Sequence, residues 1–230
     1  LLVSTVVLTL GADAGSGLIL LMVPALFFFI PGDILSAAMF ELAAGRITAG
    51  SAQLVNSIFV ILLLFVGVVF GTILTGTDRT LLFGAAADAQ FPGWVPWLGW
   101  ALFALGFMWA FSVRMAHYGW ILLVTLVTFG AQQLGTILFG ELIGTYLAAA
   151  VMILVAGAIA AGSGRPPVLV LSLSAFFVLT VGALGLEGVT ALVSGDPVSG
   201  FTDLLKMLSI GLSIALGILT GAILLRRETP

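Results

Sequence analysis

Long apolar stretches, separated by short segments containing Gly, Pro, Asp or Arg, run through the whole sequence. Crossing a hydrocarbon core of roughly 30 Å takes about 20 helical residues, so stretches near that length predict transmembrane helices. Only helices and closed barrels satisfy every backbone group in lipid, and these stretches lack the alternation of barrel strands. The sequence therefore predicts an all-α, polytopic transmembrane helical bundle. The predicted helices are a partial one at 1–10, followed by 16–31, 53–76, 96–113, 118–138, 141–161, 166–186 and 203–225.

The composition narrows the possible functions. Only 7% of the residues are charged, against about 25% in soluble domains, so most of the surface is expected to face the lipid bilayer. No run of like charges occurs, which argues against a nucleic-acid partner. The chain has no cysteine and a single histidine, His117, and it shows no catalytic triad or phosphate-binding loop. We therefore expect neither an enzyme nor a cofactor. Leu1 opens directly into an apolar run without a basic region, which predicts a start within a helix rather than a signal peptide.

Two connections are longer than the others, and each predicts a half-buried helix too short to span: residues 32–52 and residues 187–202. Residues 77–95 carry charges and prolines and predict a linker between two halves. The expected organisation is the end of a first repeat at 1–76, the linker, and a second repeat with five helices at 96–230.

An internal repeat appears when the sequence is shifted by 150 residues, which aligns 21–74 with 171–224 without a gap. Leucine matches are common in apolar chains, whereas glycines mark close approach or special backbone conformation. Five glycine pairs share the register: Gly32 and Gly182, Gly45 and Gly195, Gly50 and Gly200, Gly67 and Gly217, Gly71 and Gly221. Within these pairs, the spacing Gly67-x-x-x-Gly71 recurs as Gly217-x-x-x-Gly221, which predicts that both helices pack closely on equivalent partners, or on each other.

The two copies are predicted to have opposite orientations. Four other spans lie between 53–76 and 203–225, so equivalent helices differ by five crossings, and an odd difference inverts the topology. With the C-terminus in the cytoplasm, five basic residues lie inside and two outside, as the positive-inside rule requires. The inner set is Arg46, Arg114, Arg165, Arg226 and Arg227, and the outer set is Arg79 and Lys206.

Two groups of residues could contact a substrate or a proton. The first is the break at Pro31, Gly32 and Asp33, with Gly182 and Glu187 in the second copy. Acids beside broken helices suit a substrate ammonium or a coupling proton. The alternative is that both acids are ordinary helix N-terminal residues favoured by the dipole.

The second group contains the amides Gln132, Gln133 and Asn56, which lie within apolar stretches. They either line a polar path for a hydrophilic solute or hydrogen-bond between helices.

The sequence resembles the threonine/serine exporter family, as a pattern of glycines and spans over nearly the whole chain. The first half is similar in Pro31-Gly32 followed by an acid and in "ELAAGRITAGSAQLVNSIFVILLLFVGVVFG". The second half is similar in "WALFALGFMWAFSVR", "GWILLVTLVTFGAQQLGTILFG" and "GLEGVTALVSGDPVSGFTDLLKMLSIGLSIALG". The family's second Pro-Gly appears here as Val181-Gly182, so only the glycine matches.

The resemblance implies ten spans in two five-helix halves, of which this chain would lack the first two and part of the third. It also implies proton-coupled export of small hydroxy amino acids. We therefore expect a transporter in the bacterial plasma (inner) membrane whose partners are lipid, protons and a small polar amino acid, with homo-oligomerisation left open. A passive pore and a membrane scaffold subunit remain as alternatives.

Overall fold

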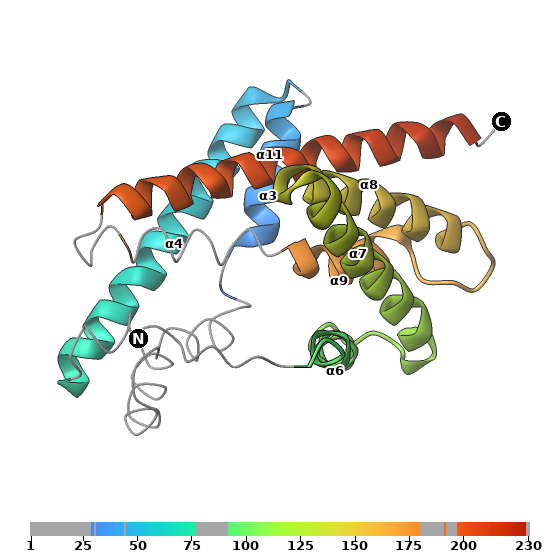
Figure 1. Ribbon diagram of the computed structural model, residues 1–230, viewed down its shortest axis with the longest axis horizontal. Helices are drawn as coiled ribbons and strands as arrows, with labels where there is room; N and C mark the ends of the chain where they lie inside the picture. Colours follow the sequence, from blue (N-terminus) through green and yellow to red (C-terminus); the bar gives the residue numbers. More distant parts are fainter. Residues whose placement is uncertain are drawn as a thin grey trace. The chain divides into compact units, whose positions relative to one another are not determined.

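The computed structural model describes residues 29, 31–43, 45–76, 92–179, 191 and 197–228, and this part is all-helical, with no strand among the residues it describes (Figure 1). The elements are α3 (Gly32–Ala43), α4 (Ile47–Thr75), α6 (Val95–Ala110), η3 (Met115–His117), α7 (Tyr118–Phe139), α8 (Glu141–Ala160), α9 (Val168–Phe176), η4 (Phe177–Leu179) and α11 (Pro197–Glu228).

Four of these helices are long and apolar enough to cross a membrane: Ile47–Thr75, Met115–Phe139, Glu141–Ala160 and Val198–Leu225. They correspond to four predicted spans and indicate a membrane protein in contact with the lipid bilayer. The predicted spans 1–10 and 16–31 lie outside the described residues, apart from 29 and 31.

Two other predicted spans correspond to shorter apolar helices, Val95–Ala110 and Val168–Leu179. The first has 16 residues, which at 1.5 Å per residue is less than the thickness of the hydrocarbon core.

The connection predicted at 32–52 contains a helix, α3, but its last six residues already belong to α4. The turn between them ends at Gly45, whose φ of +79° favours glycine, and Arg46 forms an ion pair with Glu41. Gly50 then comes close to α3, because a Cβ there would lie 2.9 Å from the carbonyl oxygen of Ala38.

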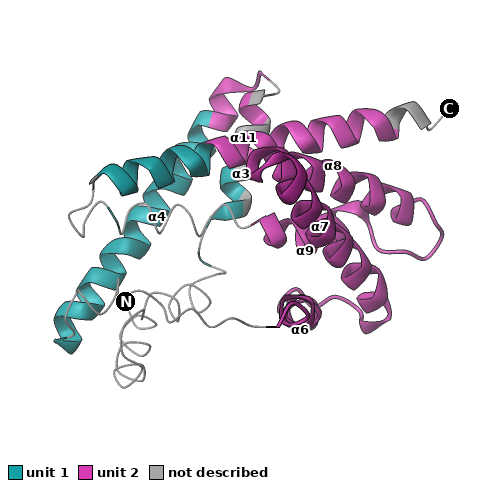
Figure 2. Ribbon diagram, viewed as in Figure 1, with its two compact units in different colours: residues 1–35, 51–90, 181–208 teal, residues 36–50, 91–180, 209–230 magenta. Residues whose placement is uncertain are grey.

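The chain divides into two compact units (Figure 2), each interrupted in sequence. Unit 1 comprises Leu1–Leu35, Ser51–Gln90 and Val181–Leu208, and unit 2 comprises Ser36–Gly50, Phe91–Thr180 and Ser209–Pro230. Most of the predicted linker, 77–91, lies outside the described residues, so the division into two repeats stays a prediction.

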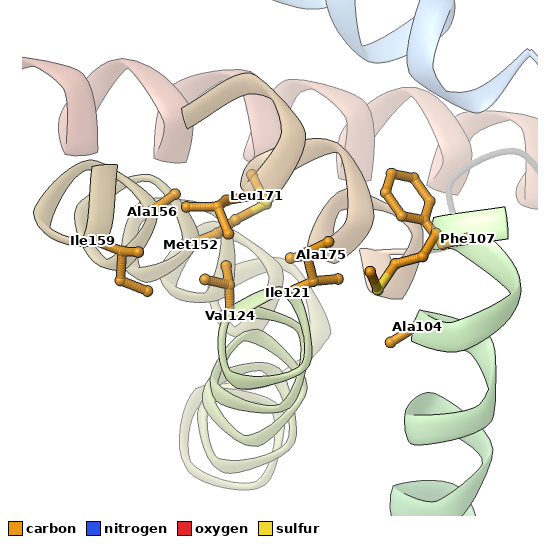
Figure 3. Close-up of a cluster of buried hydrophobic side chains, with 10 residues drawn as sticks. Ala104, Phe107, Ile121, Val124, Met152, Ala156, Ile159, Leu171 and Ala175 are labelled. Carbon is orange, nitrogen blue, oxygen red and sulfur yellow. The ribbon is translucent and has the colours of Figure 1, made fainter. Parts of the chain in front are cut away.

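Unit 2 is built around a hairpin of α7 and α8. Gly140 joins the two helices with a φ of +87°, which glycine adopts without strain. Beside the turn the backbones touch, because a Cβ on Gly135 would lie 2.6 Å from the Cα of Gly144. Helices α6 and α9 complete the core (Figure 3). Its buried side chains are Ala104, Phe107, Met108, Ile121, Val124, Met152, Ala156, Ile159, Leu171 and Ala175.

The C-terminal part of α11 packs along α8 through the second small-residue motif. A Cβ on Gly217 would collide with the carbonyl oxygen of Tyr146, and one on Gly221 would lie 2.8 Å from that of Ala150. Further along, Leu225 covers Gly157. Contact positions increase together in both helices, so α11 runs parallel to α8 (Figure 1). The close packing predicted for this motif is therefore present, and its partner is α8.

Candidate functional site

The predicted break at Pro31 and Gly32 is the start of a helix. Pro31 is buried, its carbonyl oxygen accepts a hydrogen bond from the Leu35 amide at 2.9 Å, and Gly32 is the first residue of α3. Asp33 follows in the first turn, where the helix dipole favours an acid. This position fits the ordinary structural interpretation and leaves a transport role as a prediction. The side chain of Asp33, and the whole of Gly182 and Glu187, lie outside the described residues.

Helix α4 presents a polar residue that sequence reasoning missed. Gln53 is half-buried, and its Oε1 atom is fully buried without a hydrogen-bond partner among the described residues. Ser57, one turn later, is buried and donates to the backbone carbonyl of Gln53 at 2.9 Å. Leaving a buried acceptor unpaired costs about 1–3 kcal/mol, so native proteins seldom keep one without a reason. A substrate donor is one such reason.

Asn56, the predicted residue on this helix, is exposed. The buried face of α4 continues from Ser57 through Ile61 and Val68 to Thr72, a helical spacing that leaves Asn56 to one side. The amide placed towards the protein interior on this helix is therefore Gln53. The sequence signal that could have identified it is this 3.6-residue periodicity, because Gln53 lies one turn before Ser57.

The two predicted glutamines of α7 differ in burial. Gln132 is half-buried and continues a line from Thr125 and Thr128, which are both fully buried, whereas Gln133 is exposed. The two threonine hydroxyls donate to the carbonyl oxygens of Ile121 and Val124 within the helix, each at 2.8 Å. Both hydroxyl donors are therefore used within the helix, whereas Gln132 brings a side-chain amide, with a donor and an acceptor, to the same face.

Polar contacts between α8 and α11 have a structural role that the sequence analysis did not assign. The Tyr146 hydroxyl donates to the Thr220 hydroxyl at 3.1 Å, and Ser213 donates to the carbonyl oxygen of Leu142. Thr220 in turn donates to Leu216 within its own helix. These bonds join the same two helices as the glycine contacts, and they stabilise the interface.

Among the described residues, no three His, Cys, Asp or Glu side chains are grouped so that they could hold a metal ion. The polar groups on the described helices include the half-buried amides of Gln53 and Gln132 and the half-buried acid Asp203 near the start of α11.

Comparison with known proteins identifies no relative: no protein-family model, no curated protein and no solved structure matches this chain. The resemblance to the threonine/serine exporters therefore rests on the residues quoted above.

Proposed function

We propose that this protein is a secondary transporter of the bacterial plasma membrane that exports small polar amino acids, threonine or serine, in exchange for protons. The observation that carries the proposal is the placement of two long apolar helices. Helix α4 begins at Ile47 and α11 begins at Pro197, which are 150 residues apart, the same shift that aligns the five glycine pairs. Two equivalent membrane helices are what an internal transporter repeat requires.

The expected mechanism is movement of one inverted repeat against the other around a central site. The proposal requires all four apolar segments between α4 and α11 to cross the membrane, the 16-residue α6 included, because five crossings then invert the second copy, with the C-terminus in the cytoplasm. In this proposal Asp33 and Glu187 exchange a proton or contact the substrate ammonium, while Pro31, Gly32 and Gly182 interrupt the helices.

Two amides on buried faces are separate candidates for a substrate hydrogen bond, Gln53 in unit 1 and Gln132 in unit 2, ahead of the exposed Asn56 and Gln133. A repeat relation supports Gln53, because the equivalent position in the second copy is Asp203, which is polar and half-buried. A substrate with ammonium, carboxylate and hydroxyl groups needs both acceptors and donors, which amides and acids supply together.

Efflux of radiolabelled threonine and serine from proteoliposomes, with and without a proton gradient, tests the proposal. Wild-type efflux is expected to require the gradient, and Asp33→Asn and Glu187→Gln are each expected to abolish this requirement or the efflux itself. Efflux that is independent of the gradient and survives both changes would favour a passive pore. Absence of efflux for both amino acids would favour a scaffold subunit.

A second pair of variants locates the site on α4. Gln53→Leu is expected to raise KM or lower kcat at least tenfold, because a lost substrate hydrogen bond leaves partners unpaired. Asn56→Leu makes the same chemical change three residues away on an exposed position and is expected to leave transport within about twofold. Equal effects of the two variants would remove Gln53 from the site.

A further inference from the structure

Three helices of unit 2, α7, α8 and α11, have one end in common. Helices α7 and α8 are antiparallel through the turn at Gly140, so the start of α7 and the end of α8 lie at the end away from this turn. The C-terminal part of α11 runs parallel to α8, and Leu225 contacts Gly157 near the end of α8. The end of α11 therefore lies at the same end of unit 2.

This end, which we call the basic end, carries four of the seven Lys and Arg residues of the chain. Arg114 precedes η3 and α7, Arg165 follows α8, and Arg226 and Arg227 come directly after Leu225 in α11. His117 lies beside them at the start of α7. Glu228 follows the two arginines, whereas Glu141 lies at the opposite end, next to Gly140. The sum of these charges makes the basic end positive.

Arg165 is held in a defined position at the basic end. Its guanidinium carbon lies 4.6 Å from the centre of the Trp120 ring, and Nη1 donates to the carbonyl oxygen of Ile159 at 3.4 Å. The side chain also crosses Gly162, where a Cβ would lie 2.5 Å from Nε. Stacking on an aromatic ring orders the planar guanidinium, and an ordered fork of N–H groups can meet phosphate oxygens in two places.

The location of this site along the membrane follows from the helices. Trp120 lies in the first turn of α7, and tryptophan is enriched where the hydrocarbon core meets the headgroups. Because α7, α8 and α11 are each long enough to span, their shared end reaches the headgroup layer. The exposed side chains of Arg114 and Arg165 are therefore at the depth of lipid phosphates.

We propose that the basic end of unit 2 binds anionic phospholipid headgroups, with Arg165 on Trp120 as the ordered contact and Arg114, Arg226 and Arg227 as further positive charges. Charge complementarity selects anionic over zwitterionic lipid, since each arginine near the surface adds attraction only where the lipid carries net negative charge. The inference does not depend on the transport function, because it uses only the packing of α7, α8 and α11.

The test is native mass spectrometry of the full chain in detergent, titrated with phosphatidylglycerol or with phosphatidylcholine. The wild type is expected to bind phosphatidylglycerol at least tenfold more tightly. Arg165→Gln is expected to weaken this binding about fivefold, and Arg165→Lys by less, because the charge is kept and the planar fork is lost. Arg46→Gln is the matched control, because Arg46 pairs with Glu41 in the α3–α4 turn, and it is expected to change binding less than twofold.

Equal affinity of the wild type for both lipids would overturn the proposal. So would an equal loss in Arg46→Gln and Arg165→Gln, because total charge rather than the basic end would then determine binding. If Arg165→Gln fails to fold, Arg114→Gln replaces it, since Arg114 is exposed in a turn. An unchanged affinity in a folded Arg114→Gln variant would then contradict the assignment of that residue and of the site.

Discussion

Helices α4 and α11 carry the same glycine spacing in the same repeat register, but their surroundings differ. In α11, Gly217 is buried against the backbone of α8, whereas the equivalent Gly67 in α4 is only half-buried. Three positions further on, α11 has Thr220, bonded to Tyr146, and α4 has Phe70, whose side chain is 54% exposed. Gly71 and Gly221 are both buried, so the two copies of the motif differ at its first glycine, where the small residue can allow close packing but only α11 uses it against α8.

The largest difference between the two helices is expected for alanine at the equivalent glycines. Gly217→Ala places a methyl group against the carbonyl oxygen of Tyr146 and 2.7 Å from the Cβ of Ala149, and such overpacking destabilises by about 1–3 kcal/mol. Gly67→Ala is expected to be neutral or to stabilise by up to about 1 kcal/mol, because alanine has the higher helix propensity. Thermal unfolding in detergent measures both.

An equal fall in Tm for Gly217→Ala and Gly67→Ala would contradict the expected difference, since both glycines would then be required by close packing. A suitable control is Gly106→Ala in α6, where no atom lies within 4 Å of the added Cβ. Its Tm is expected to stay at or slightly above the wild-type value.

A smaller difference is expected for the polar contact between α8 and α11. Tyr146→Phe removes the hydroxyl that donates to Thr220, and interhelical hydrogen bonds of this kind contribute about 0.6 kcal/mol on average. Thr220 keeps its bond to Leu216, so no donor is left unpaired. The matched change in α4, Phe70→Leu, affects an exposed side chain and is expected to alter stability by less than about 0.5 kcal/mol.

The same unfolding measurement decides whether the Tyr146 bond matters. A Tyr146→Phe variant as stable as wild type would assign the α8–α11 interface to glycine packing alone. A double variant with Thr220→Val separates the hydrogen bond from the packing of the two side chains. If the two residues share one bond, adding the second substitution lowers the Tm little further.

The smallest effect on stability is expected at Gln53 in α4. Its buried Oε1 has no partner among the described residues, so Gln53→Leu is expected to leave Tm unchanged or to raise it slightly, although transport falls. Asn56→Leu, on an exposed position, is also expected to leave Tm nearly unchanged, with transport retained. A clear fall in Tm for Gln53→Leu would indicate a structural hydrogen bond instead of a substrate contact.

The spans at 53–76, 118–138, 141–161 and 203–225 could be predicted because each is a long apolar run. Their ends could not, since α4 begins six residues early and α11 begins at Pro197. Hydropathy detects the part of a helix inside the hydrocarbon, whereas hydrogen bonding continues the helix into the polar interface. Helix α6 shows the opposite difference, because it ends at Ala110 although the apolar stretch continues to residue 113.

The burial of the candidate site residues could not be predicted from the sequence. The sequence shows that amides occur in apolar stretches, but it selected Asn56, which is exposed, and passed over Gln53. It also treated Gln132 and Gln133 alike, although consecutive residues on a helix lie about 100° apart and only Gln132 faces inwards. All four amides lie within apolar stretches of sequence, so their polarity does not show whether they face lipid or the protein interior.

The helical membrane architecture follows from the sequence, because backbone groups in lipid must be satisfied within each segment and that requirement is local. The buried faces, the packing of Gly217 and Gly221 on α8, and the contact of Arg165 with Trp120 are seen only in the folded chain. These contacts join residues distant in sequence, and lipid-facing and protein-facing surfaces are equally apolar, so only the packing of helices against one another distinguishes them.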